Sequence, residues 1–319
     1  MCIRDRYTQV EQLNKTALKA HGVDPNGQLY KINSFEFYRY EDVIRLTTDP
    51  AYDQTAFEKH LEIKGNSDHS KLIKMLDVLN DESSSMDDEL FVTYFDKENI
   101  AYWMAFQLLT GNTDTQNRNV YLYSPQNSSK WYLWDWDNDG MLRRREREII
   151  NFSDSESWER GVSNYWGNVL FRRCLQTQSY RDMLDTAMKE LYAYMNEERI
   201  QSMMEHYRSV TEKYVWQMPD RMNVPITHDE YEEVLKSIWP EIDENYNYYW
   251  ESYRKPMPFY IGEPQVVNGS LLLNWDPSYN FEIENIYYTV ELAKDYLFTT
   301  TFFRQENLIC LLYTSDAAD

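Results

Sequence analysis

The sequence predicts an α+β fold, and three patterns support this class. Several segments between residues 71 and 253 place apolar side chains at helical spacing, which predicts a largely helical body. The residues Val120–Tyr123 and Trp131–Trp134 alternate as strands do around a turn that contains Pro125, and they predict a β-hairpin within that body. After Lys255, strand-like alternation resumes and predicts a separate all-β part.

The first third of the chain is predicted to mix short helices with one clear strand. The turn His21–Gly27 contains Gly, Pro and Asn and precedes the strand Gln28–Ile32. The other expected elements are a strand that turns into a helix at Tyr7–Ala20, a partly helical stretch at Arg39–Lys64, an amphipathic helix at Lys71–Asn80 and a polar acidic loop at Asp81–Asp88.

A longer helix is expected between Asp96, which suits an N-cap, and Gly111, which suits a helix end. Its residues at helical spacing, which we expect to be buried, are Ile100, Trp103, Met104, Gln107 and Leu108. The helix therefore delivers the polar segment Asn112–Asn119 as a loop at its C-terminal end.

Helices also dominate the stretch that follows the hairpin. A polar loop is expected first, at Asn151–Ser163. The helices that the periodicity then predicts are Tyr165–Cys174, Tyr180–Met195, Glu197–Met218 and Asp229–Tyr253, with Pro240 kinking or splitting the last.

The polar loop and the hairpin carry residues that suit phosphoryl transfer. Asp114 and Asn119 are five positions apart, and Asp135 and Asp137 follow the second strand of the hairpin. Phosphoryl transfer needs a carboxylate to orient the attacking hydroxyl, and it needs an amide and a second carboxylate to hold Mg²⁺ against the phosphates. The spacing therefore favours a kinase catalytic loop followed by a metal loop.

The hairpin explains how these residues can meet. Asn119 and Asp135 flank its two strands, so both lie at its open end. Carboxylate and amide oxygens are hard donors that suit Mg²⁺ or Mn²⁺ rather than zinc. The five histidines are scattered without ligand spacing, so no zinc site is predicted.

A calcium loop is an alternative interpretation of the same aspartates. Asp135, Asp137, Asp139, Gly140 and Glu146 fit the pattern D-x-D-x-D-G-x₅-E. Such a loop follows a helix, whereas a strand is expected before Asp135. A plain solvated acidic turn is a second alternative.

The chain resembles the spore coat protein H (CotH-type) family of atypical secretory-pathway protein kinases. The resemblance rests on a helix followed by GN-x-D-x-x-x-x-N-x-YLY and by a strand that ends in W-D-x-D, and it covers roughly Tyr7 to Lys255. By position it implies that Asp114 is the catalytic aspartate, that Asn119 binds the nucleotide with its metal, and that Asp135 and Asp137 bind the metal. The family usually has Pro where this chain has Leu133.

The resemblance implies an atypical protein-kinase-like fold, here mainly the helical C-lobe with a catalytic hairpin. It also implies ATP with Mg²⁺ or Mn²⁺ as cofactors, a protein substrate with a Ser or Thr acceptor, and a location outside the cytoplasm: secreted, at the cell surface or in a spore coat. Lys31 falls near the family's nucleotide lobe, so it either contacts the nucleotide or is a surface lysine that closes a strand. A non-catalytic scaffold of the same family is a further alternative.

The segment 256–309 is predicted to be part of a fibronectin type III-like β-sandwich. Trp275 and Tyr288 carry this likeness. About three or four strands are too few to close a two-sheet core. We therefore expect Leu297, Phe298, Phe302 and Phe303 to lack partners.

Both ends of the chain are expected to be sequencing-adapter read-through rather than protein. Back-translation of Met1–Asp5 gives DNA whose reverse complement encodes Cys310–Thr314. The predicted domains are therefore the adapter segments 1–6 and 310–319, the kinase-like domain 7–255 and the partial sandwich 256–309. Since no glycine-rich phosphate loop is found, we expect a fragment without most of its nucleotide lobe that is inactive as it stands.

Composition limits the remaining function classes. The net charge of −21, from 53 acidic and 32 basic residues, argues against a nucleic-acid partner. Outside the predicted adapter segments Cys174 is the only cysteine, so no disulfide is expected, and no apolar stretch could span a membrane. The basic run Arg143–Glu148 is either a surface helix or a patch for phosphate or an acidic peptide.

Overall fold

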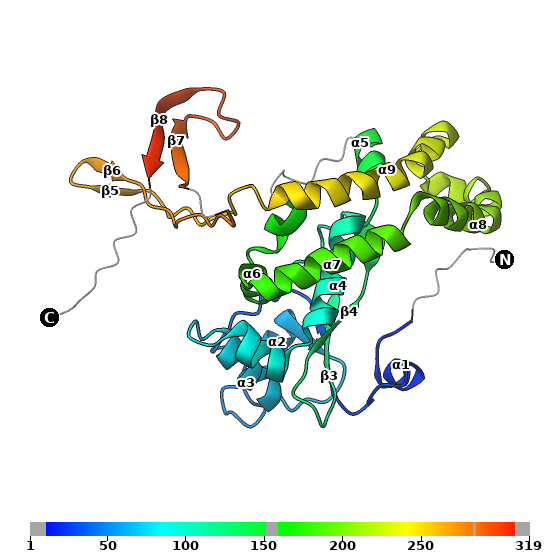
Figure 1. Ribbon diagram of the computed structural model, residues 1–319, viewed down its shortest axis with the longest axis horizontal. Coiled ribbons are helices and arrows are strands. Elements are labelled where there is room, and N and C mark those ends of the chain that lie inside the picture. Colours follow the sequence, from blue (N-terminus) through cyan, green and yellow to red (C-terminus); the bar gives the residue numbers. More distant parts are fainter. Residues whose placement is uncertain (1–10, 151–158, 283–284, 310–319) are drawn as a thin grey trace. The chain divides into compact units, whose positions relative to one another are not determined.

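The computed structural model describes residues 11–150, 159–282 and 285–309 (Figure 1). It divides into two compact units, Met1–Tyr249 and Trp250–Asp319, which are treated separately below. Most of the predicted helices and the predicted site belong to the first unit. The predicted adapter segments 1–6 and 310–319 lie outside the described residues, so the interpretation of the two ends stays a prediction.

An antiparallel sheet of four strands lies at the centre of the first unit, in the order β2-β1-β3-β4. The strands are β1 (Gln28–Ile32), β2 (Leu61–Ile63), β3 (Val120–Ser124) and β4 (Tyr132–Asp135). The strands β3 and β4 form the predicted hairpin, and β2 was expected only as part of an irregular stretch. Val120 pairs with Asp135 at the open end of the hairpin.

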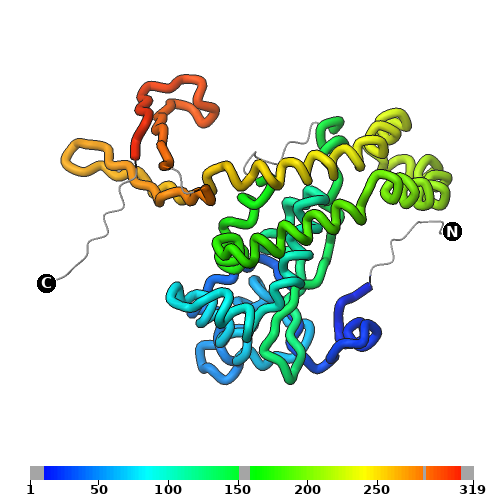
Figure 2. Tube along the Cα trace, in the orientation of Figure 1, coloured from blue at the N-terminus to red at the C-terminus, as the bar shows by residue number. Residues whose placement is uncertain are grey.

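The sheet is covered on both faces. On one face, Leu18 of the short helix α1 (Lys15–Ala20) belongs to one buried cluster with Tyr121 and Tyr123. Figure 2 shows the course of the backbone through these segments. On the other face, Leu122 and Leu133 are buried on the side of α4 (Lys97–Thr110). Because alternate residues of a strand face opposite sides, each face of β3 and β4 packs against its own helix.

The expected helical body is confirmed, which makes the unit α+β. Helix α4 packs along α7, and the side chains of Tyr192 and Tyr249 join α7 to α9. The remaining helices are α2 (Gln54–His60), α3 (Ser70–Leu79), α5 (Arg144–Ile149), α6 (Val169–Gln176), α7 (Gln178–Tyr194), α8 (Glu197–Val215) and α9 (His228–Ser252). The structure also contains a π-helix (Met86–Tyr94) and 3₁₀ turns at Asn138–Gly140, Gly161–Tyr165 and Asp220–Asn223. Pro240 does not split α9.

Helix α4 begins and ends as its sequence predicts. The Asp96 carboxylate accepts a hydrogen bond from the backbone N–H of Asn99 at 2.8 Å. Gly111 ends the helix with φ of 63°, a left-handed conformation that costs glycine little. These two ends determine where the following loop, Asn112–Asn119, leaves the helix.

The side chain of Asn99 protects the free edge of β4. Its Nδ2 donates to the Leu133 carbonyl at 3.2 Å, and its Oδ1 accepts from the Leu133 N–H at 2.7 Å. The amide therefore takes the place of a neighbouring strand, and it ties α4 to the strand that carries Asp135.

Replacing Asn99 with Ala should destabilise the first unit by about 2 to 4 kcal/mol, because the buried N–H and C=O of Leu133 would lose their partners. The shift of the urea midpoint measures this. Asn247→Ala is the matched control, since Asn247 is exposed and bonds only to Asp243. Equal shifts for both variants would contradict the role of Asn99.

The second unit consists of two antiparallel hairpins. Strands β5 (Gln265–Val267) and β6 (Ser270–Leu272) form one, and β7 (Tyr287–Ala293) and β8 (Thr301–Ile309) form the other. The rings of Trp275 and Tyr288 are 5.7 Å apart. As expected, Leu297, Phe298, Phe302 and Phe303 are exposed. The likeness to a fibronectin sandwich stays a prediction.

Two further observations concern the chain as a whole. No helix among the described residues combines the length and the apolar character that crossing a bilayer requires. Cys174 is fully buried, as expected of a packed residue, and burial raises the pKa of its thiol.

Candidate active site

The loop Asn112–Asn119 is held from two sides. Asn168, the N-cap of α6, donates to the Gln116 carbonyl at 2.8 Å. The Thr115 and Tyr165 hydroxyls are 3.2 Å apart within the core. On the other side, the Asn117 amide donates to Glu36 at 2.6 Å. The loop therefore has a defined conformation before any ligand binds.

Asp114 and Asn119 are in direct contact across this loop. Nδ2 of Asn119 donates to Oδ2 of Asp114 at 2.8 Å, and Nε of Arg118 donates to Oδ1 at 2.6 Å. Asn119 adopts a left-handed backbone with φ of 56°, which Asn tolerates better than most residues. Since its amide nitrogen is used by Asp114, the amide oxygen of Asn119 is the atom that remains for another partner.

Asp135 is held from the side of α4. Its Oδ1 accepts a hydrogen bond from Nε2 of Gln107 at 2.8 Å. An open groove of about 590 Å³ between α4 and β4 lets solvent reach the carboxylate, while protein on the α4 side limits its hydration. This desolvation raises the pKa of Asp135 to about 6, and the hydrogen bond from Gln107 opposes the shift.

A buried amide network joins the loop to the hairpin. Oε1 of Gln107 accepts from Nδ2 of Asn112 at 3.0 Å, and the same Nδ2 lies 3.2 Å from Oδ1 of Asn138. A Cβ placed on Gly140 would lie 2.9 Å from the Asn112 side chain. Gln107 and Asn112 were not among the predicted site residues. A signal for Gln107 was available, since it is a polar residue in an otherwise apolar stripe.

Asp137 lies at the turn that follows β4. Its φ is 57°, in the left-handed region where a non-glycine residue is uncommon. Strain of this kind concentrates at functional sites. The side chain is exposed and makes no hydrogen bond or ion pair among residues 11–150, 159–282 and 285–309.

A comparison with protein families identifies the family of this chain. A model of the CotH kinase protein family matches residues 6–249. The chain belongs to this family. The comparison with curated proteins found no match. The matched region ends at residue 249, where the first compact unit also ends, six residues before the predicted domain boundary at residue 255.

The CotH assignment and the strand before Asp135 both weigh against a calcium loop. Asp135 ends β4, Asp137 follows it and Asp139 lies within the 3₁₀ turn Asn138–Gly140, so a strand rather than a helix leads into the loop. Glu146, which would close a calcium loop, is paired with Arg143 at 2.9 Å. Helix α5 confirms the expected surface helix at the basic run.

Lys31 is not close to Asp135 in the CotH site. In the sheet it aligns with Tyr121 and Trp134, one position away from the Val120–Asp135 pair, so the two side chains face opposite sides. Its ammonium lies 5.6 Å from the centre of the Trp136 ring, which supports its interpretation as a surface lysine at the end of a strand.

The donor set at the open end of the hairpin fits Mg²⁺. Asn119 offers an amide oxygen, Asp135 offers the oxygen that Gln107 does not use, and Asp137 offers an unpaired carboxylate. A bound Mg²⁺ would neutralise phosphate charge there. Asp114 pairs with Asn119 rather than joining Asp135 and Asp137 in a cluster of three carboxylates.

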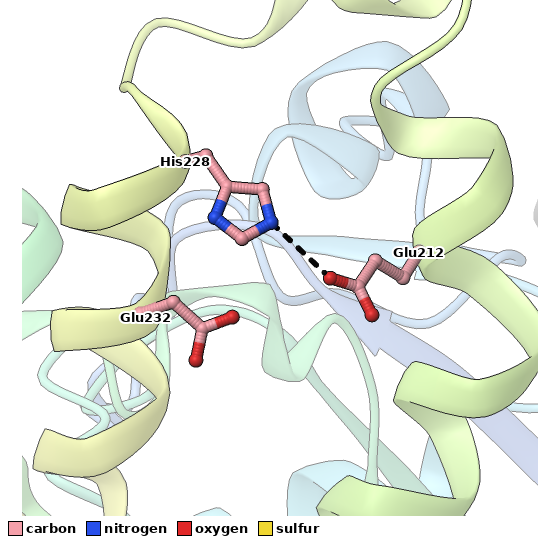
Figure 3. Close-up of side chains that lie close together, drawn as sticks. All are labelled: Glu212, His228 and Glu232. Atoms are coloured by element: carbon pink, nitrogen blue, oxygen red, sulfur yellow. Dashed lines mark ion pairs between the residues drawn. The ribbon is translucent and has the colours of Figure 1, made fainter.

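Another group of potential ligands lies on α8 and α9. Glu212, His228 and Glu232 bring their ligand atoms within 4.8 Å of one another, with His228 Nε2 at 3.3 Å from Glu212 (Figure 3). Arg208 already donates to both carboxylates, at 2.9 Å to Glu212 and 3.0 Å to Glu232. Because Arg208 already donates to both carboxylates, we interpret the group as an ion-pair network that joins two helices.

The raised pKa of Asp135 predicts a pH-dependent stability difference. Above about pH 6 the folded protein bears the cost of a poorly hydrated charge, whereas the unfolded chain, with the ordinary pKa of 3.8, does not. Asp135→Asn should therefore melt at a higher temperature than the native protein at about pH 7.5, and the difference should vanish toward about pH 4.

Thermal melts across this pH range measure the difference, with the exposed Asp139→Asn as the control. Mg²⁺ should raise the melting temperature of the native protein more than that of Asp135→Asn. A difference between native and Asp135→Asn that is constant with pH would show that Asp135 does not titrate as described.

Proposed function

We propose that this CotH-family protein transfers the γ-phosphoryl group of ATP to a Ser or Thr hydroxyl of a protein substrate. The observation that carries the proposal is the contact between Asp114 and Asn119 beside the end of β4 that bears Asp135. The family match supports a kinase-like protein in general terms.

Each residue has a separate role in this proposal. Asp114 orients the acceptor hydroxyl and takes up its proton, and Asn119 holds Asp114 in place. The amide oxygen of Asn119 would serve as a ligand of a bound Mg²⁺. Asp135 and Asp137 supply carboxylate oxygens to the metal. Gln107 is a positioning residue, because it holds the Asp135 carboxylate without reaching the reacting groups.

We further propose that the protein acts outside the cytoplasm, on exported or surface proteins. Membership of the CotH family supports this, since the family is associated with the spore coat. The formal charge of −21 fits a protein substrate rather than a nucleic acid.

Phosphotransfer should depend on the aspartates of the site. In a protein restored upstream of Tyr7, Asp114→Asn and Asp135→Asn should each lower the rate by about 100-fold or more, because they remove the base or a metal ligand. Transfer of labelled phosphate to a Ser- and Thr-containing protein measures this. Asp139→Asn should leave the rate unchanged, whereas a calcium loop would require Asp139.

The 319-residue chain should bind ATP weakly and transfer no phosphate. The protein restored upstream of Tyr7 should bind ATP more tightly and transfer its phosphate. The reason is that the sequence contains no glycine-rich loop to cover the phosphates. Calorimetric titration with ATP and Mg²⁺ compares the two forms. Equal activity in both forms would contradict the expected need for a further nucleotide lobe.

A non-catalytic scaffold is the second candidate, and one observation favours it. The ion pair of Arg118 with Asp114 occupies the oxygen that a catalytic base would use. If the restored protein folds, binds ATP and transfers no phosphate even as Arg118→Ala, the scaffold is the better assignment.

A further inference from the structure

A pocket of about 510 Å³ lies beside the proposed active site and is not part of it. Gln107, Asn112, Thr113 and Gly140 line one side of it, whereas the proposed site residues Asp114, Asn119, Asp135 and Asp137 do not line it. Its other walls come from α5, the segment around Arg160 and α9. The proposed kinase reaction does not use this pocket.

Two arginines in the pocket converge on a single oxygen atom. Nη1 of Arg144 lies 2.7 Å from Oε1 of Glu244, and Nη2 of Arg160 lies 2.9 Å from the same oxygen. Two guanidinium groups that share one carboxylate oxygen use only part of their donor capacity. The position of Oε1 therefore marks a place where the protein already stabilises an oxyanion.

Arg160 is oriented before any ligand binds. Its guanidinium stacks 4.5 Å from the centre of the Tyr248 ring and lies 3.5 Å from the amide oxygen of Asn245. Its side chain and that of Arg144 are each only 32% exposed. These two side chains would therefore lose little conformational entropy when a ligand binds.

Two carboxylates close to these arginines, Glu241 and Glu244, differ in burial. Glu241 is 4% exposed, and burial raises its pKa, which favours the neutral form. Glu244 stays ionised: partial burial opposes ionisation, but Arg160 and Arg144 lower its pKa overall. Glu244 is also exposed over 54% of its side chain, so it can swing into solvent when another anion takes its place.

We propose that this pocket binds a phosphate group, with Glu244 as the built-in anion that the phosphate displaces. A phosphate has several terminal oxygens, so each guanidinium can bind its own oxygen instead of sharing one. Free phosphate and a phosphorylated side chain share this chemistry. The inference holds whether or not the chain is an active kinase.

The position of the pocket gives binding a structural consequence. Arg144 begins α5, which follows the turn that carries Asp137, and the Leu142 N–H bonds to the Thr110 carbonyl at 2.9 Å. A phosphate held by Arg144 and Arg160 would therefore fasten the segment after the proposed metal loop to the segment around Arg160.

Calorimetric titration of the 319-residue chain with inorganic phosphate at low salt tests the proposal. Saturable binding to one site is expected. Arg160→Gln should weaken it by roughly tenfold or more, because a charge-assisted hydrogen bond is lost. Glu244→Gln should tighten binding, because the competing carboxylate is removed. If phosphorylated side chains are the natural ligand, O-phosphoserine should bind about as tightly as inorganic phosphate. If free phosphate is the natural ligand, O-phosphoserine should not bind. Acetate should bind more weakly than inorganic phosphate in both cases.

Arg145→Gln is the matched control. Arg145 lies on the same helix and pairs with Glu148 and Glu233, but it does not line the pocket. Any of three results would overturn the proposal. Phosphate does not bind, Arg145→Gln weakens phosphate binding as much as Arg160→Gln does, or Glu244→Gln does not tighten it. If Arg160→Gln does not fold, Arg160→Lys replaces it, since lysine keeps the charge but loses the planar fork and should weaken binding severalfold.

Discussion

The pairing of Val120 with Asp135 is the constraint on which the rest of the site depends. Since alternate strand residues face opposite sides, this register points Leu133 and Asp135 toward α4, and Trp134 toward α1. A slip of one residue would turn Asp135 away from Gln107 and would bring Trp134 into the position of Leu133. The apolar packing on both faces opposes such a slip, so the contacts that stabilise the sheet also position the carboxylate.

The polar groups beneath the hairpin are tolerated because they bond to one another. Gln107 uses both ends of its amide, donating to Asp135 and accepting from Asn112. Asn112 in turn reaches Asn138, so α4 and the two loops that carry the proposed site form one connected network. An unsatisfied amide at this depth would cost more than the network contributes, and a satisfied one rigidifies its neighbours. The same network forms a wall of the arginine-lined pocket.

Positive charge is concentrated near the site in a protein that is strongly acidic. Arg143, at the N-cap of α5, pairs with Glu146, and Arg145 within α5 pairs with Glu148. Arg144 and Arg160 differ because they share Glu244. Solvent screens the exposed pairs, so their contribution to stability is small. We expect the placement of these arginines to affect anion binding more than it affects the stability of the fold.

The sequence by itself determined the local elements: the hairpin, the α4 helix from its Asp96 cap to Gly111, and the order of Asp114, Asn119, Asp135 and Asp137. These features depend on residues close together in the chain, whose spacing and turn chemistry are visible without a structure. The three-residue strand β2 was missed because it exists only by pairing with β1. Gln107 was assigned to an apolar stripe because its partner, Asp135, is 28 positions away. Only the tertiary structure decided which polar groups meet: Arg144, Arg160 and Glu244 come from three separate segments, and the long-range packing that joins them leaves no periodic pattern in the sequence.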